Sequence, residues 1–273
     1  MAYHADTLNY LSRLASGGGT ISTFNTDLID TKIKQLYAYG LRGTTNYLKY
    51  WLKPNLSNTF TGSLVPVYDD GVGNPTNTNF VSGDWDSTGL KGNKIDKTLN
   101  SNWNFTTQLG SFASRYDVHI GMWLTDVVDA NSYGVLIGNT ASPVASPNNN
   151  DIEIYTAAGE IDAKMLSRNI AAILTKTTGL YLGNRTAINN SRLLLNNSLV
   201  ASSATNATTP VDPNYPCYFL SWGAFAGSFS GARFSDAFMG FGLTPTQETN
   251  LYNILAITQP FYNYASPLML SAC

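Results

Sequence analysis

This 273-residue chain contains little charge, few histidines and few cysteines, and each shortage excludes a class of site. Charged residues make up 12% of it, about half the usual share of roughly 25% in soluble domains. With a formal net charge of -2 and a pI near 5.6, no basic surface for a phosphate backbone is expected. With cysteine only at Cys217 and Cys273, neither a disulfide framework nor a cysteine zinc site is expected.

Long apolar runs are also missing. The first residues, Met1 to Asp6, lack the basic start and apolar run of a secretory signal. No later stretch approaches the ~20 apolar residues that cross a bilayer. We therefore expect a protein made in the cytoplasm that does not insert into a membrane.

Two helices are predicted near the N-terminus. Leu8, Leu11 and Leu14 recur at helical spacing and are followed by three glycines from residue 17 to residue 19. A second apolar stripe runs from Phe24 to Tyr37 and ends before a glycine at position 40. Both stripes need a partner surface, which is either the remainder of this chain or a neighbouring subunit.

Beyond about Tyr47 the apolar pattern changes to a period of two, which indicates half-buried strands separated by turn residues. In residues 118–125 the odd and even positions face opposite ways. Further runs are expected at Leu64–Tyr68, Tyr133–Ile137, Asp151–Tyr155, Leu180–Thr186, Arg192–Leu195, Tyr218–Trp222 and Arg233–Phe241. This repetition predicts a mainly β protein, an antiparallel two-sheet sandwich with short N-terminal helices and a C-terminal helix.

Two local signals fix particular boundaries. Asn196 and Asn197 can supply the left-handed backbone angles of a tight hairpin. Thr244, Pro245 and Gln247 predict a capping box and a helix through about residue 256. We expect three parts: a helical attachment segment at 1–46, a sandwich at 47–258 and a C-terminal arm at 259–273, with docking on other chains through the two ends.

The candidates for catalysis are few. Asp151 and Glu153 share one strand face, as the acid pair of a sandwich-fold glycosidase would, but Tyr155 stands where a further acid completes that pattern. His119 is the only strand histidine, and no nucleophile elbow accompanies it. The expectation is no catalytic residue and a protein that is not an enzyme. A polysaccharide-degrading hydrolase remains the alternative.

The sequence also offers candidate residues for metal binding and for sugar binding. Asp69, Asp70, Asp84 and Asp86 are oxygen ligands that suit calcium, but their positions are typical of turn acids, so neither a metal nor another cofactor is expected. Exposed aromatic rings in turn-rich regions can stack on a sugar, and the alternative is that they pack in the core. The candidate carbohydrate-binding residues are Trp85, Trp103, Tyr215 and Phe225.

Several ordered motifs resemble one known family. They begin with Tyr10–Thr20, Leu41 and Leu64–Val67, and the most specific are residues 79–93 (NFVSGDWDSTGLKGN) and 97–100 (KTLN). Looser matches follow at 119–124, 134–138, 179–185 and 242–244. The chain is similar to jelly-roll proteins of the laminin-G and concanavalin A type that tailed bacteriophages encode. Where the family commonly has Asn-Gly at the tight hairpin, this chain has Asn197-Ser198.

The resemblance implies a structural protein on the surface of a virus particle, either associated with the tail or a fibre or decorating the capsid. Expected partners are other virion proteins, copies of the chain itself and host-surface glycan. The family has no defined catalytic residues to transfer. A free-standing lectin and a sandwich-fold glycoside hydrolase remain the alternatives.

Overall fold

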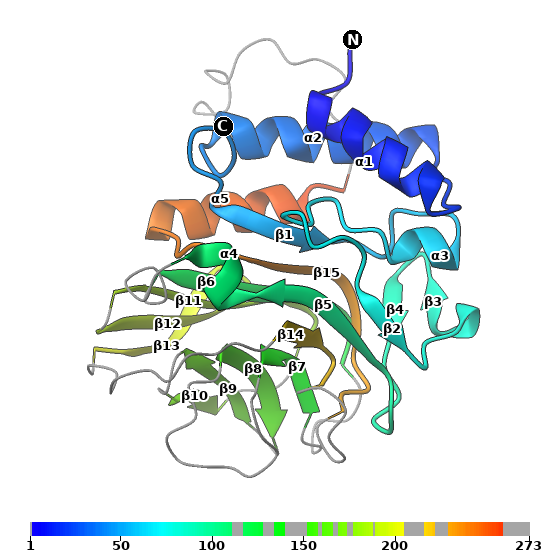
Figure 1. Cartoon of the computed structure of the whole chain (residues 1–273). Coiled ribbons are helices and arrows are strands. Elements are labelled where there is room, and N and C mark those ends of the chain that lie inside the picture. The colour runs from blue at the N-terminus through cyan, green and yellow to red at the C-terminus, as the bar shows by residue number, and fades with distance from the viewer. Residues whose placement is uncertain are drawn as a thin grey trace.

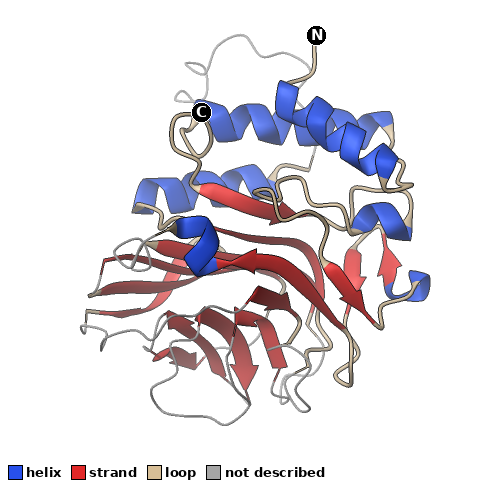
Figure 2. Ribbon diagram, viewed as in Figure 1, coloured by secondary structure: helices blue, strands red, loops and turns tan. Residues whose placement is uncertain are grey.

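The computed structural model describes residues 2–110, 117–127, 134–139, 152–157, 160–165, 169–173, 177–187, 189–204, 216–221 and 229–258. Within these residues the fold is an antiparallel two-sheet β-sandwich with a layer of helices over one sheet, as Figures 1 and 2 show. The predicted fold class is therefore confirmed. No helix in the described ranges has both the length and the apolar character needed to cross a membrane.

The larger sheet has eight strands among the described residues, in the order β13-β12-β11-β6-β15-β4-β3, with β1 also paired to β15. Its strands are β1 (Leu48–Leu52), β3 (Trp85–Asp86), β4 (Gly89–Lys91), β6 (Val118–Asp126), β11 (Gly179–Ala187), β12 (Asn190–Leu195), β13 (Ser198–Ser203) and β15 (Arg233–Gly240).

The second sheet has seven strands in the described part of the chain, in the order β10-β9-β8-β7-β14-β5-β2. They are β2 (Thr76–Thr78), β5 (Thr98–Asn104), β7 (Gly134–Asn139), β8 (Ile152–Ala157), β9 (Glu160–Met165), β10 (Asn169–Ile173) and β14 (Pro216–Phe219). One core lies between the sheets, where Ile120, Met122, Tyr181, Phe219 and Phe234 are fully buried. The run predicted at 64–68 forms no strand and contributes only an isolated bridge from Tyr68.

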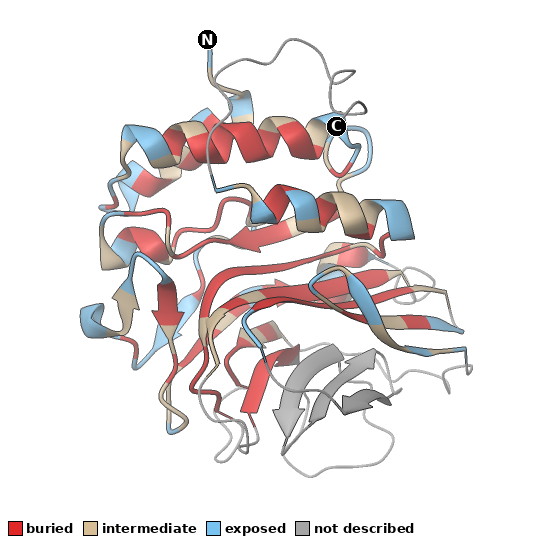
Figure 3. Cartoon of the chain, turned by 180° about the vertical axis from the view of Figure 1, so that it is seen from behind, coloured by how far each residue is buried: buried red, intermediate tan, exposed pale blue. Residues whose placement is uncertain are grey.

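The helix layer consists of α1 (Ala5–Ser16), α2 (Thr23–Ala38) and α5 (Pro245–Ala256), with the shorter α3 (Phe60–Ser63), α4 (Phe105–Leu109) and a 3-10 turn η1 (Ser82–Asp84) elsewhere. A second core lies between the long helices and the outer face of the larger sheet. Ile33 and Leu251 pack there with Leu180 and Phe238. The strands β11 and β15 are therefore buried on both faces, as the burial colours of Figure 3 show.

The predicted N-terminal helices are present, but α1 presents a different face to the core. Thr7, Tyr10 and Leu14 are buried, whereas Leu8 is 53% exposed. Residues of α1 and α2 belong to the same core as the sheet, so segment 1–46 packs on its own sandwich. Attachment to another chain through this segment stays a prediction, and the arm at 259–273 lies outside the described residues.

The local signals at the C-terminal end are confirmed. Asn196 and Asn197 form the two-residue turn between β12 and β13, with φ of 49° and 65°. Both angles are left-handed, which is the requirement of a type I′ hairpin. Thr244 caps α5 by accepting a hydrogen bond from the backbone of Gln247, whose side chain bonds back to the backbone of Thr244.

Candidate functional site

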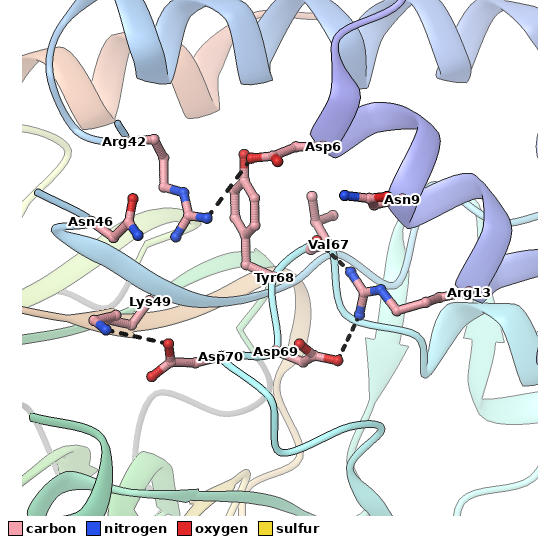
Figure 4. Close-up of a pocket in the computed structure, with 10 residues that line it drawn as sticks. All are labelled: Asp6, Asn9, Arg13, Arg42, Asn46, Lys49, Val67, Tyr68, Asp69 and Asp70. Carbon is pink, nitrogen blue, oxygen red and sulfur yellow. Dashed lines mark hydrogen bonds and ion pairs between the residues drawn. The ribbon is translucent and has the colours of Figure 1, made fainter. Parts of the chain in front are cut away.

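A cavity of about 260 Å³ lies between α1, the segment that follows α2, and the loop at residues 67–70. Figure 4 shows that side chains from these three segments converge on it. The lining residues are Asp6, Asn9, Arg13, Arg42, Asn46, Lys49, Val67, Tyr68, Asp69 and Asp70. All but one of them carry a polar or charged side chain, so the cavity is a polar site with many hydrogen-bonding groups.

The α1 wall follows from helical geometry. Asp6, Asn9 and Arg13 are three and four residues apart, which places them on one helix face. The carboxylate of Asp6 is held in place because the hydroxyl of Tyr37 donates to its Oδ2 at 2.9 Å. His4 caps the helix by accepting from the Asp6 backbone at 3.1 Å.

The opposite wall begins where α2 ends. Gly40 adopts a left-handed φ of 68° and Gly43 a φ of 120°, which lets the chain turn back toward the sheet. Arg42 lies between these glycines, donates to the carbonyl of Leu48 at 2.9 Å and places its guanidinium 4.0 Å from the ring centre of Tyr68. This cation-π contact fixes Arg42 over the floor of the cavity.

Charges of opposite sign are paired across the cavity. Arg13 lies 2.8 Å from Asp69, and Lys49 lies 3.3 Å from Asp70. Arg42 and Asp6 are 3.8 Å apart, too far for a hydrogen bond. These six side chains are between 14% and 34% exposed. Three positive and three negative groups can therefore reach a ligand without giving the cavity a large net charge.

Tyr68 forms the floor. Its backbone pairs with that of Trp51, which ties the 67–70 loop to β1. The side chain is 6% exposed and its hydroxyl has no hydrogen-bond partner. Burial and then the negative charge of Asp6 raise the pKa of Tyr68, and the nearby Arg42 only partly opposes this, so the phenol keeps its proton.

The aromatic residues proposed from sequence do not form this site. Trp103 is fully buried, packs edge-on against Phe105 and reaches the cavity only through a hydrogen bond of 3.4 Å to Asp70. Trp103 is therefore a core residue, which was the alternative to sugar binding. Trp85 is half-buried and donates to the carbonyl of Pro54 at 2.9 Å. Tyr215 and Phe225 lie outside the described residues.

The acids weighed as calcium ligands are divided between separate places. Asp69 and Asp70 line the cavity, each paired with a base, and Asp69 also caps a turn through the backbone of Gly71. Asp84 pairs with Lys97, and Asp86 pairs with Arg233 at 2.7 Å. Among the described residues, the four acids make no common cluster.

The sequence offered two kinds of candidate catalytic residue, an acid pair and a histidine. Asp151, and the side chain of Glu153 in β8, lie outside the described residues. His119 is fully buried, and burial lowers its pKa to about 4, a shift that its hydrogen bond with the carbonyl of Phe241 partly opposes. It faces no open surface and has a structural role.

Most residues of the cavity were not identified from sequence. Only Asp69 and Asp70 were singled out, and for a different reason. The spacing of Asp6, Asn9 and Arg13 was the available signal, since it places three polar side chains on one helix face. Such a face usually points to solvent, so the spacing does not by itself indicate a cavity. No sequence signal brings Arg42 or Tyr68 to that face, since they meet α1 only through tertiary packing.

No family model matches the chain, and no curated protein sequence matches it. Solved structures do resemble it. The Trypanosoma rangeli sialidase in complex with sialic acid superposes with a TM-score of 0.53 at 12% identity, over 83% of this chain and 38% of the sialidase. A mutant of this sialidase displaying trans-sialidase activity matches over 92% of this chain and 39% of its own, at 14% identity and a TM-score of 0.53.

The binding domain of botulinum neurotoxin serotype D is also similar, with a TM-score of 0.50 at 12% identity, over 76% of this chain and 52% of that domain. The chain thus spans about two fifths of the sialidases and about half of the toxin domain. Likeness at this identity shows a shared fold.

These comparisons contradict the expectation that the protein is not an enzyme. Solved structures that share this fold over about two fifths of their own length include the sialidases, which are enzymes. In the sequence, the pair Asp151 and Glu153 lacks the further acid of a sandwich-fold glycosidase, and no nucleophile elbow is present. A site does not require such local motifs, because tertiary structure brings together groups such as Tyr68, Asp6 and Arg42 that no sequence motif connects.

Proposed function

We propose that this protein recognises carbohydrate and that the cavity under α1 is its glycan-binding site. The observation that carries the proposal is the convergence of six partly exposed charged side chains, with Asn9 and Asn46, on one cavity. Sugars present hydroxyl groups that both donate and accept, so they match a site with paired donors and acceptors. The sialidase and toxin folds support this choice.

The direct test is a glycan array probed with the full chain, followed by calorimetry with the strongest glycan. Lys49→Met removes one charged donor from the cavity. Its matched control is Lys91→Met, because Lys91 is also a strand lysine paired with an aspartate, Asp126 at 2.9 Å, but lies outside the cavity. We expect about tenfold weaker binding for Lys49→Met and no change for the control. An array without signal, or equal affinities, contradicts the proposal.

Hydrolysis of a glycosidic bond is the second candidate function. Tyr68 lies in the cavity with Asp6 and Arg42, and sialidases are glycosidases that use a tyrosine nucleophile. Because the phenol of Tyr68 keeps its proton, the carboxylate of Asp6 would have to accept this proton as Tyr68 attacks. The test is release of free sugar from sialyllactose and from the array glycans. Tyr68→Phe should abolish release, whereas Tyr50→Phe should not, because the equally buried hydroxyl of Tyr50 belongs to the sandwich core. Release that survives Tyr68→Phe rules out this role for Tyr68.

We further propose display on the surface of a bacteriophage particle, in contact with other virion proteins and with copies of itself. The sequence motifs at 79–93 and 97–100 support this location. Mass spectrometry of purified particles, with antibody labelling of intact ones, tests it. Absence of the chain from particles contradicts it.

A further inference from the structure

A second cavity of about 250 Å³ lies on the same side of the larger sheet, between α2, the end of α5 and the segment after β1. Buried charged residues line it. Lys32, Lys53 and Asp236 are 1%, 5% and 1% exposed. Charged groups are rarely buried to this degree unless each is paired, so the pairing of these three decides what the cavity can bind.

The carboxylate of Asp236 is fully engaged. Lys53 donates to both of its oxygens at 3.0 and 2.9 Å. The indole of Trp51 donates at 3.0 Å and the hydroxyl of Ser235 at 2.8 Å. Burial by itself raises the pKa of Asp236, but the charges of Lys53 and Lys32, with the hydrogen bonds from Lys53 and Ser235, more than offset it and lower the pKa. Asp236 is therefore ionised and already matched by Lys53.

Lys32 has no carboxylate of its own here. Its ammonium donates to the carbonyl of Leu255 at 2.6 Å, at the C-terminal end of α5, where a cation is favourable. A carbonyl carries only a partial charge. Burial, followed by repulsion from Lys53, lowers the pKa of Lys32 well below its ordinary value, against the attraction of Asp236. Two amines thus share one carboxylate, and with Lys32 protonated the cluster can accept one further negative charge.

Two other lining residues point to a sugar. The Oδ1 of Asn55 is buried and has no hydrogen-bond partner, so it is an acceptor suited to a hydroxyl. The indole of Trp123 also lines the cavity and is held by stacking on Tyr252, with ring centres 5.7 Å apart. A fixed aromatic ring beside polar groups is an arrangement that suits the apolar face of a sugar ring.

We infer that this second cavity binds a carboxylate-bearing sugar unit, with its carboxylate at Lys32 and Lys53, a hydroxyl at Asn55 and its ring against Trp123. The volume of about 250 Å³ lies just below the usual range of ligand sites, so the cavity suits nothing larger than a single sugar unit. The inference rests on the proposed function in taking a sugar as ligand, but it uses residues separate from those of the α1 cavity.

Binding is expected to be linked to protonation. A bound carboxylate favours the charged form of Lys32, so binding takes up a proton when the free amine is neutral. The groups facing Lys32 are Lys53, Asp236 and the carbonyl of Leu255. Affinity should therefore fall as pH rises, and more steeply than for a neutral sugar.

The experiment is calorimetry of the full chain with glucuronate, N-acetylneuraminate, acetate and galactose at about pH 6 and about pH 8. Lys32→Met is compared with Lys34→Met, because Lys34 is two residues away in α2 on the surface, paired with Asp30 at 2.6 Å. We expect both acidic sugars to bind more tightly at the lower pH. Lys32→Met should weaken them at least about tenfold, and Lys34→Met by less than about twofold.

A further variant guards against misfolding. Asn55→Asp is isosteric and places a negative charge at the hydroxyl subsite. It should therefore weaken binding of the acidic sugars while the melting temperature of the protein stays the same. The inference would be overturned if galactose or acetate bound as tightly as glucuronate. It would also be overturned if Lys32→Met bound glucuronate with unchanged affinity. The two proposals fail separately: an unchanged Lys49→Met with the array glycan contradicts the α1 cavity, and an unchanged Lys32→Met with glucuronate contradicts this one.

Discussion

The ammonium nitrogen of Lys53 lies 2.9 Å from Oδ2 of Asp236, and their side chains are only 6% and 2% exposed. The pair joins the end of β1 to β15 beneath the helix layer. Because both charges are removed from water, each depends on the other for compensation, and this makes the pair a sensitive point of the fold.

Lys53→Met should destabilise the protein by about 3 kcal/mol or more, because it leaves the carboxylate of Asp236 buried without its main partner. Urea unfolding measures the loss. The double variant Lys53→Met with Asp236→Leu should recover most of it, because no unpaired carboxylate remains. Lys91→Met breaks a far more exposed pair with Asp126 and should change stability by less than about 1 kcal/mol. Equal losses in the two single variants would contradict the argument.

Acid should destabilise the fold through His119. Burial lowers the folded-state pKa of His119 to about 4 from the ordinary 6.5. As pH falls from 6.5 toward 4, the unfolded chain takes up a proton that the folded chain cannot, so stability is present above that window and is lost within it. The loss attributable to His119 reaches about 3 kcal/mol.

The measurement is the free energy of unfolding between about pH 7 and about pH 4. His119→Asn should flatten the profile, because the asparagine amide can still donate to the carbonyl of Phe241 but does not titrate. Carboxylates contribute equally to both proteins. An unchanged slope in the variant would show that His119 does not control the acid response.

Gly89 is a position where only glycine fits. Its φ is +130°, and a Cβ atom there would lie 1.9 Å from the carbonyl oxygen of Phe234 in β15. Gly89→Ala should therefore cost at least about 2 kcal/mol in chemical denaturation. The matched Gly83→Ala meets nothing within 4 Å and should stay within about 0.5 kcal/mol of the parent. A tolerated alanine at Gly89 would mean that β4 and β15 can separate without loss.

The cap of α5 gives a smaller, local prediction. Thr244→Ala removes the side chain that accepts from the backbone of Gln247 and should cost about 1 kcal/mol. Thr246→Ala, in the exposed first turn of the same helix, should be close to neutral because alanine is the better helix former. The measurement is the melting temperature of each variant in thermal unfolding. Equal melting temperatures for Thr244→Ala and Thr246→Ala would contradict the predicted role of the cap.

The sequence by itself determined the features that depend on neighbouring residues. The spacing of apolar residues predicted α1, α2 and the sandwich strands, because helix and strand periods differ. Thr244 with Gln247, and Asn196 with Asn197, fixed a helix start and a hairpin, because caps and tight turns require particular side chains or backbone angles.

Only the tertiary structure decided which strand faces are covered twice and which side chains meet. Helices over the larger sheet bury His119, Lys32 and Asp236, whose polar character predicts exposure. The α1 cavity joins Arg13 to Asp69 across 56 positions of chain, and Trp103 became a core residue. Local patterns carry no record of such contacts, because their energies arise only when distant segments have packed together.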